Sequence, residues 1–80
     1  MNHVTIDYYA VLRERSGRRR ETRATAAPTL RALYEELRAA YAFPLAADRV
    51  LAAVAERYVD MDGPVTDGLE VAFIPPVAGG

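Results

Sequence analysis

One segment of this chain has the pattern of a surface helix, and it limits the folds open to the whole sequence. Between Pro28 and Pro44, apolar side chains recur every three or four residues, at Leu30, Leu33, Tyr34, Leu37 and Tyr41. This spacing places them on one side of a helix. Thr29 is suited to cap its N-terminus, and Pro44 requires the helix to end soon after the stripe. A helix with a single apolar face needs another element to cover that face.

Strands at the two ends of the chain are the natural partners of this helix. Near the N-terminus, Val4, Ile6 and Tyr8 alternate with outward-facing residues, and near the C-terminus Val71 and Phe73 do the same. Strict alternation of this kind predicts strands that are buried on one face.

The remaining segments complete the expected order of elements. Residues 10–17 predict a short helical turn closed by Gly17, and the polar residues 18–25 predict a solvent-exposed edge strand. The apolar run within 49–56 predicts a central strand covered on much of both faces, and 57–60 a brief strand after it. One helix over one sheet gives an α+β domain. If the first and last strands are parallel neighbours in its centre, the mixed sheet forms a ubiquitin-like β-grasp.

Composition limits the functions that this fold could carry. Eighty residues predict a single domain, 1–80, and the absence of cysteine excludes a disulfide framework and thiolate chemistry. A net charge of −1 argues against a nucleic-acid partner. We see no signal peptide or membrane span, and therefore expect a cytoplasmic protein. His3 is the only histidine, so we expect no metal site and no bound cofactor.

Arg18, Arg19 and Arg20 follow one another in the predicted hairpin. They could form a small site for an anion, but a solvated hairpin face is the simpler interpretation.

The last six residues, Pro75, Pro76, Val77, Ala78, Gly79 and Gly80, have no strand or helix pattern. We expect them to form an extended tail that does not pack in the core, with a stiff Pro-Pro start and a reach of roughly 20 Å. Side chains shrink toward Gly80, so the end of the chain would fit a narrow tunnel. A terminal carboxylate is unreactive at neutral pH. Adenylation would activate it, and sulfide could then convert the adenylate to a thiocarboxylate.

Three segments of the chain resemble one known family. Residues 67–80 read D-G-L-E-V-A-F-I-P-P-V-A-G-G and resemble the C-terminal signature of molybdopterin synthase small subunits, roughly D-G-D-E-V-A-F-F-P-P-V-S/T-G-G. Residues 8–14, Y-Y-A-V-L-R-E, are similar to the early F-F-A-x-L/V-R-E stretch of this ubiquitin-like sulfur-carrier family. Ala53-Val54 and Tyr58-Val59 match its A-V-N-x-x-Y/L-V segment.

The resemblance implies a β-grasp fold and a sulfur-carrier cycle in molybdenum cofactor biosynthesis. An E1-like adenylyltransferase would use ATP and Mg to adenylate Gly80, and a sulfurtransferase or cysteine desulfurase system would supply sulfur for the thiocarboxylate. The tail would then enter the large synthase subunit and give its sulfur to cyclic pyranopterin monophosphate. Two small and two large subunits would form the heterotetramer. The chain would not be catalytic alone, because the catalytic side chains would belong to its partner.

Strand alternation also predicts where a partner docks. Tyr9 and Ile74 face away from the helix, and Tyr58 lies on the brief strand nearby. Together they would form an exposed apolar patch beside the tail, which is typical of a partner site. The alternative is that the tyrosines pack at the edge of the core with wet hydroxyl groups.

Some residues differ from the family pattern, and other functions remain open. Leu69 replaces an acid, Ala55 stands where the family often has asparagine, and Ile74 replaces a phenylalanine. We expect these differences to affect the choice of partner. The alternatives are a sulfur carrier for another pathway, such as thiamine synthesis or tRNA thiolation, and a ubiquitin-like binding module without carrier chemistry.

Overall fold

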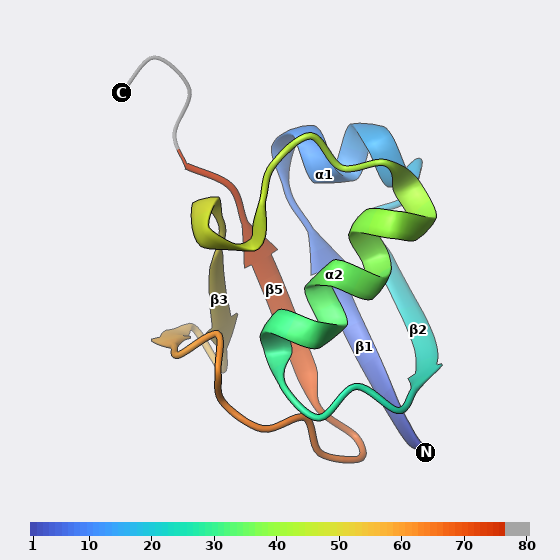
Figure 1. Cartoon of the computed structure of the whole chain (residues 1–80), viewed down its shortest axis with the longest axis vertical. Helices are drawn as coiled ribbons and strands as arrows, with labels where there is room; N and C mark the ends of the chain where they lie inside the picture. Colours follow the sequence, from blue (N-terminus) through green and yellow to red (C-terminus); the bar gives the residue numbers. More distant parts are fainter. Residues whose placement is uncertain (77–80) are drawn as a thin grey trace.

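Five strands form one mixed sheet, and one long helix lies across one face of it (Figure 1). The computed structural model describes residues 1–76 of the chain. In chain order the elements are β1 (Asn2–Tyr8), α1 (Ala10–Ser16), β2 (Arg20–Thr25), α2 (Leu30–Tyr41), the 3-10 turn η1 (Ala47–Arg49), β3 (Leu51–Val54), β4 (Arg57–Val59) and β5 (Glu70–Ile74). The expected α+β class is confirmed, and none of the described helices is long and apolar enough to cross a membrane.

The two ends of the chain meet in the middle of the sheet. The strand order is β2-β1-β5-β3-β4, and β1 runs parallel to β5, with Ile6 opposite Val71 and Tyr8 opposite Phe73. The other neighbouring pairs are antiparallel. This confirms the β-grasp arrangement. Because β1 and β5 run in the same direction, the C-terminal end of β5 lies at the same end of the sheet as the start of α1 (Figure 1).

The core lies between α2 and the sheet. The buried side chains of the helix are Leu30, Leu33, Tyr34 and Leu37, and those of the central strands are Val4, Ile6, Tyr8, Val71 and Phe73. Aromatic rings connect the two layers, since the Tyr34 and Phe73 centroids are 5.4 Å apart and those of Tyr8 and Phe43 are 5.9 Å apart. Such ring pairs stabilise the domain beyond the area that they bury.

Helix α2 begins as its sequence predicts, and distant residues complete its cap. The Thr29 hydroxyl accepts a bond from the Ala32 N–H at 3.1 Å. The Leu30 N–H donates to the carbonyl of Gly63 at 3.0 Å, so the loop before β5 satisfies another free group of the first turn.

The expectation for residues 49–56 is only partly right. They do contain β3, but this strand lies second from the edge and is not covered on both faces. Leu51 is 51% exposed, whereas Ala52 is buried. The reason is that the single long helix covers only one side of the sheet, and an apolar run alone cannot show which of its residues face that helix.

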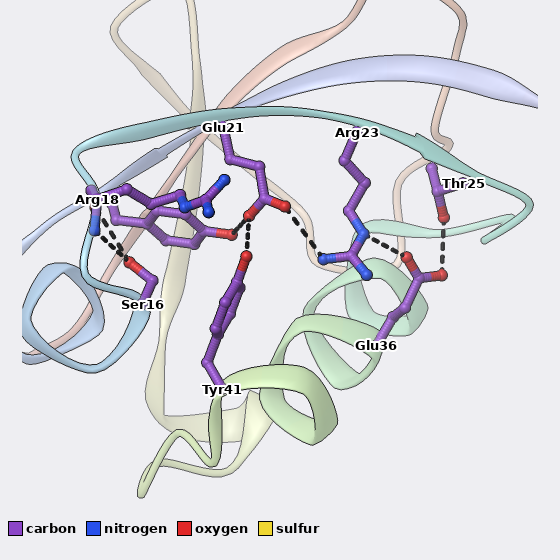
Figure 2. Close-up of polar contacts among 8 residues, drawn as sticks. Ser16, Arg18, Glu21, Arg23, Thr25, Glu36 and Tyr41 are labelled. Atoms are coloured by element: carbon purple, nitrogen blue, oxygen red, sulfur yellow. Dashed lines mark hydrogen bonds and ion pairs between the residues drawn. The ribbon is translucent and has the colours of Figure 1, made fainter.

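Edge strand β2 is mostly polar, and two of its three inward residues, Glu21 and Arg23, are charged. Glu21 lies opposite the buried Ile6 in the neighbouring strand, so its carboxylate faces the helix layer. Its Oε1 atom accepts bonds from the hydroxyl groups of Tyr8, at 2.6 Å, and Tyr41, at 2.7 Å. Figure 2 shows Tyr41 reaching Glu21 from α2.

The same strand makes a second link to α2. The Arg23 guanidinium lies 3.1 Å from a carboxylate oxygen of Glu36, and the Thr25 hydroxyl donates to the other oxygen at 2.9 Å (Figure 2). Among the described residues, no buried side-chain nitrogen or oxygen lacks a partner. Inward charges of this kind also discourage pairing of an edge strand with another sheet.

Replacing Phe73 with alanine tests the register of the central strands. Phe73→Ala should lower the free energy of unfolding by about 3–5 kcal/mol, because it removes a fully buried ring. Ile74→Ala, on the outward face of the same strand, should cost about 1 kcal/mol or less. Urea unfolding followed by circular dichroism measures both values. Equal losses would contradict the assigned faces of β5.

Alkaline pH tests the polar link between β1, β2 and α2. Burial, helped by the bond to Glu21, raises the pKa of Tyr8 well above its usual range. A raised folded-state pKa means that the stabilisation is complete below about pH 10 and is lost as the pH rises, because the unfolded chain ionises first. Tyr8→Phe should therefore be less stable than wild type by about 1.5–3 kcal/mol at pH 7. The difference in the free energy of unfolding between wild type and Tyr8→Phe should shrink by about 1.4 kcal/mol per pH unit above pH 10. Parallel stability curves from pH 8 to pH 11 would contradict this.

Candidate functional site

A hollow of about 720 Å³ lies on the sheet face that α2 leaves uncovered. We call it the outer hollow. Its apolar lining residues are Tyr9, Ala53, Ala55, Tyr58, Ala72 and Ile74, and its charged ones are Asp7, Arg20, Glu56 and Glu70. The three residues of the expected apolar patch, Tyr9, Tyr58 and Ile74, therefore lie around one concave surface.

Small side chains in the middle strands form the floor of the outer hollow. Across the sheet, Asp7 pairs with Ala72, Ala72 with Ala53, and Ala53 with Tyr58. Paired residues of neighbouring strands point to the same face, so two methyl groups lie between larger neighbours. Tyr58 is 71% exposed and Tyr9 is 44% exposed. Both rings are therefore accessible to a partner from this face, Tyr58 more than Tyr9.

An ion-pair bridge forms the charged side of the outer hollow. The Arg20 Nε atom lies 2.7 Å from Asp7, and its Nη2 atom lies 2.8 Å from Glu70. The bond and charge of Asp7, followed by the charge of Glu70, raise the pKa of Arg20. Arg20, one member of the Arg18–Arg20 run, is thus held by two carboxylates, one from each strand of the parallel pair β1 and β5.

The root of the C-terminal tail leaves the sheet beside this face. Strand β5 ends at Ile74, Pro75 is buried, and Pro76 is exposed. The expectation that none of the last six residues packs against the core is wrong for Pro75. The reason is that Pro75 continues the inward alternation of Val71 and Phe73. Val77, Ala78, Gly79 and Gly80, the predicted working end, lie outside the described residues.

A match to one protein family covers residues 6–80 of the chain, which include both the outer hollow and the tail. The chain belongs to the ThiS family. Its sulfur-carrier resemblance is thereby confirmed at the family level, over nearly the whole sequence.

One curated relative and two solved structures are similar to this chain. The molybdopterin synthase sulfur carrier subunit of Escherichia coli K12 is 39% identical over 80 residues, covering 96% of this chain and 99% of that protein. A solved Pyrococcus furiosus protein, described as molybdopterin converting factor subunit 1, is 28% identical with a TM-score of 0.77, covering 96% and 100%. The small archaeal modifier protein 1 of Haloferax volcanii is 19% identical with a TM-score of 0.76, covering 96% and 100%, and it shows the fold alone.

Leu51 is an exposed apolar residue of this ThiS-family chain that sequence reasoning missed. It pairs with Ile74 across β3 and β5 and is 51% exposed, so it extends the apolar surface beside the outer hollow. The expectation of a strand covered on both faces concealed it. The signal that could have revealed it is its position two residues before Ala53, on the same face of β3.

A strained turn forms one end of the outer hollow. Ala55 and Glu56 connect β3 to β4 and have φ angles of 52° and 65°. Positive φ at both central positions is the geometry of a type I′ turn, which favours asparagine and glycine. This explains why asparagine suits position 55 in the family pattern, and it means that the present chain accepts backbone strain beside its candidate site.

Restoring asparagine should relieve that strain. We expect Ala55→Asn to raise the free energy of unfolding by about 0.5–1 kcal/mol, because asparagine tolerates the left-handed region better than alanine. Ala26→Asn is the matched control, since Ala26 is also exposed and outside the helices and strands but is not among the residues with positive φ. Thermal and urea unfolding measure both variants. A gain that is the same at both positions would rule out turn strain as its cause.

Proposed function

We propose that this chain is the sulfur carrier of molybdenum cofactor biosynthesis and the small subunit of a molybdopterin synthase. The observation that carries this proposal is the 39% identity to the Escherichia coli sulfur carrier subunit, which extends over nearly the full length of both proteins. The Pyrococcus furiosus structure supports it, because that protein is also described as a molybdopterin converting factor subunit.

In the proposed cycle the carboxylate of Gly80 is the reacting group. An E1-like adenylyltransferase binds ATP and Mg, the carboxylate oxygen attacks the α-phosphorus, and pyrophosphate leaves. A thiol reductant releases sulfide from the persulfide of a sulfurtransferase or cysteine desulfurase system and is itself oxidised to a disulfide. The sulfide then displaces AMP and leaves a thiocarboxylate. In the large subunit the sulfur passes to cyclic pyranopterin monophosphate, and water restores the carboxylate. Each carrier gives one sulfur atom, so two are needed for the dithiolene.

The described residues would supply docking and placement in this cycle. The exposed apolar side chains around the outer hollow offer a partner both area and aromatic anchors. Pro75 is buried and Pro76 is exposed, so the tail is anchored to the domain immediately after β5. For a partner bound at the outer hollow, the start of the tail would therefore lie at a fixed distance from the docking surface. The carrier is non-catalytic alone, and the catalytic groups belong to the proteins that receive the tail.

Intact-mass spectrometry tests the carrier chemistry directly. We expect incubation with ATP, Mg, the cognate adenylyltransferase and a sulfur source to shift the mass by the difference between one sulfur and one oxygen atom. A variant with one alanine added after Gly80 is the control and should show no shift. If the wild-type chain shows no mass shift with an adenylyltransferase that is shown to activate another carrier protein, the proposal is wrong.

Ile74→Asp tests the docking surface. The variant should fold normally, because Ile74 faces outward, but it should bind the large molybdopterin synthase subunit at least about tenfold more weakly. Isothermal titration calorimetry measures the affinity, and Thr22→Asp, on the exposed part of β2, is the control. Unchanged affinity would exclude Ile74 from the interface.

A carrier for another pathway is the second candidate, because the family match and the archaeal modifier protein are compatible with it. The thiocarboxylate form separates the two candidates. Transfer of its sulfur in the presence of the large synthase subunit and cyclic pyranopterin monophosphate supports molybdopterin synthesis. Transfer only with thiamine-thiazole or tRNA-thiolating enzymes would support the other pathways.

A further inference from the structure

A second hollow, of about 370 Å³, adjoins the outer hollow at the end of the sheet where α1 begins. We call it the basic hollow. It is lined by Asp7, Tyr8, Tyr9, Arg13, Arg19 and Arg20, and it shares Asp7, Tyr9 and Arg20 with the outer hollow. A protein that covers Tyr9 from the outer hollow would therefore extend over this surface too.

Arg13 is held in place without being neutralised. Its guanidinium lies over the ring of Tyr9, 5.7 Å from the centroid, and its Nε atom donates to the carbonyl of Tyr8 at 3.2 Å. A cation above an aromatic face keeps its charge. The two terminal nitrogens of the fork remain available to another acceptor.

Arg19 has a hydrogen-bonded backbone, and its side chain forms no ion pair with the residues that the structure describes. Its carbonyl accepts the N–H of Tyr8 at 2.8 Å, which connects the start of β2 to the end of β1. Within residues 1–76, the ion pairs of arginine involve Arg20, Arg23, Arg31 and Arg38, and neither Arg13 nor Arg19 takes part in one. Two uncompensated cations therefore border the basic hollow, in addition to Arg20.

A partner that covers the basic hollow must compensate these charges. Burying an unpaired guanidinium is costly, whereas a carboxylate placed opposite it restores the balance. The planar fork of arginine fits two carboxylate oxygens at once. Building on the proposed function, we propose that the basic hollow receives an acidic surface segment of the large synthase subunit, with Arg19 as a specificity-determining residue.

The charges around the two hollows also favour one docking orientation. Glu56 and Glu70 lie at the outer hollow, away from Arg13 and Arg19. A partner whose acidic segment lay against Glu56 and Glu70 would bring like charges together, which disfavours that orientation. In the favoured orientation the acidic groups of the partner lie against the basic hollow. The start of the tail then lies on the same side of the domain as the partner.

Charge reversal at Arg19 tests this proposal. Binding of the large molybdopterin synthase subunit from the same organism is measured by stopped-flow association and calorimetry, at low and high salt. Arg19→Glu should weaken binding by at least about tenfold at low salt, mainly through slower association, and the deficit should shrink as salt is added. Arg49→Glu makes the same charge change at an exposed residue outside both hollows and should alter affinity by less than about twofold.

Each outcome decides between the proposals. Circular dichroism first establishes that both variants are folded. If the wild type binds and the two variants weaken binding equally, or not at all, the basic hollow is not part of the interface, although the proposed function stands. If the wild type does not bind the large subunit, while the adenylyltransferase still activates it, both this inference and the synthase assignment are overturned.

Discussion

The parallel pairing of β1 with β5 is the interaction on which the rest of the structure depends. It brings together residues about 65 positions apart in sequence, so that Tyr8 and Phe73 form the centre of the core. The same register puts Asp7 beside Ala72 on the opposite face, where they line the outer hollow. Because the two strands run in the same direction, the start of the tail after β5 and helix α1 after β1 lie at the same end of the sheet. A possible docking surface and the arm it would serve are therefore neighbours.

A single long helix cannot cover both faces of a five-stranded sheet, and the uncovered face carries the outer hollow and its exposed apolar side chains. The small side chains of Ala53 and Ala72 form the floor of the outer hollow. Tyr9, Tyr58 and Leu51 are exposed around it, and a cluster of exposed apolar side chains is typical of a protein-binding surface. The strained turn at Ala55 and Glu56 belongs to the same surface. Exposed apolar rings and backbone strain in one place are consistent with a surface that is completed by another protein.

The arginines divide into structural and free groups, and position decides which is which. Arg23 on the inner face of β2 is neutralised by Glu36 of α2, and Arg31 binds Asp48 and Asp62 at 2.8 and 2.9 Å. These two connect the helix with strand β2 and with the loops beside it. Arg13 and Arg19 form no ion pair within the described residues, and both line the basic hollow, so they can add charge to an interface there.

Local pattern was sufficient to predict α2, the buried faces of β1 and β5, and the α+β class, because each depends on the spacing of apolar residues along one segment. The β-grasp topology came instead from the family resemblance, because the pairing of β1 with β5 joins residues far apart in the chain. The chemistry expected of Gly79 and Gly80 also came from local sequence and from family resemblance, and it remains a proposal. Tertiary structure alone decided that Leu51 is exposed, that Pro75 is buried, that Glu21 binds two tyrosines, and that Arg19 lies next to Arg13. Each of these depends on which strands are neighbours and which face the helix covers. Contacts between residues far apart in the chain settle both points.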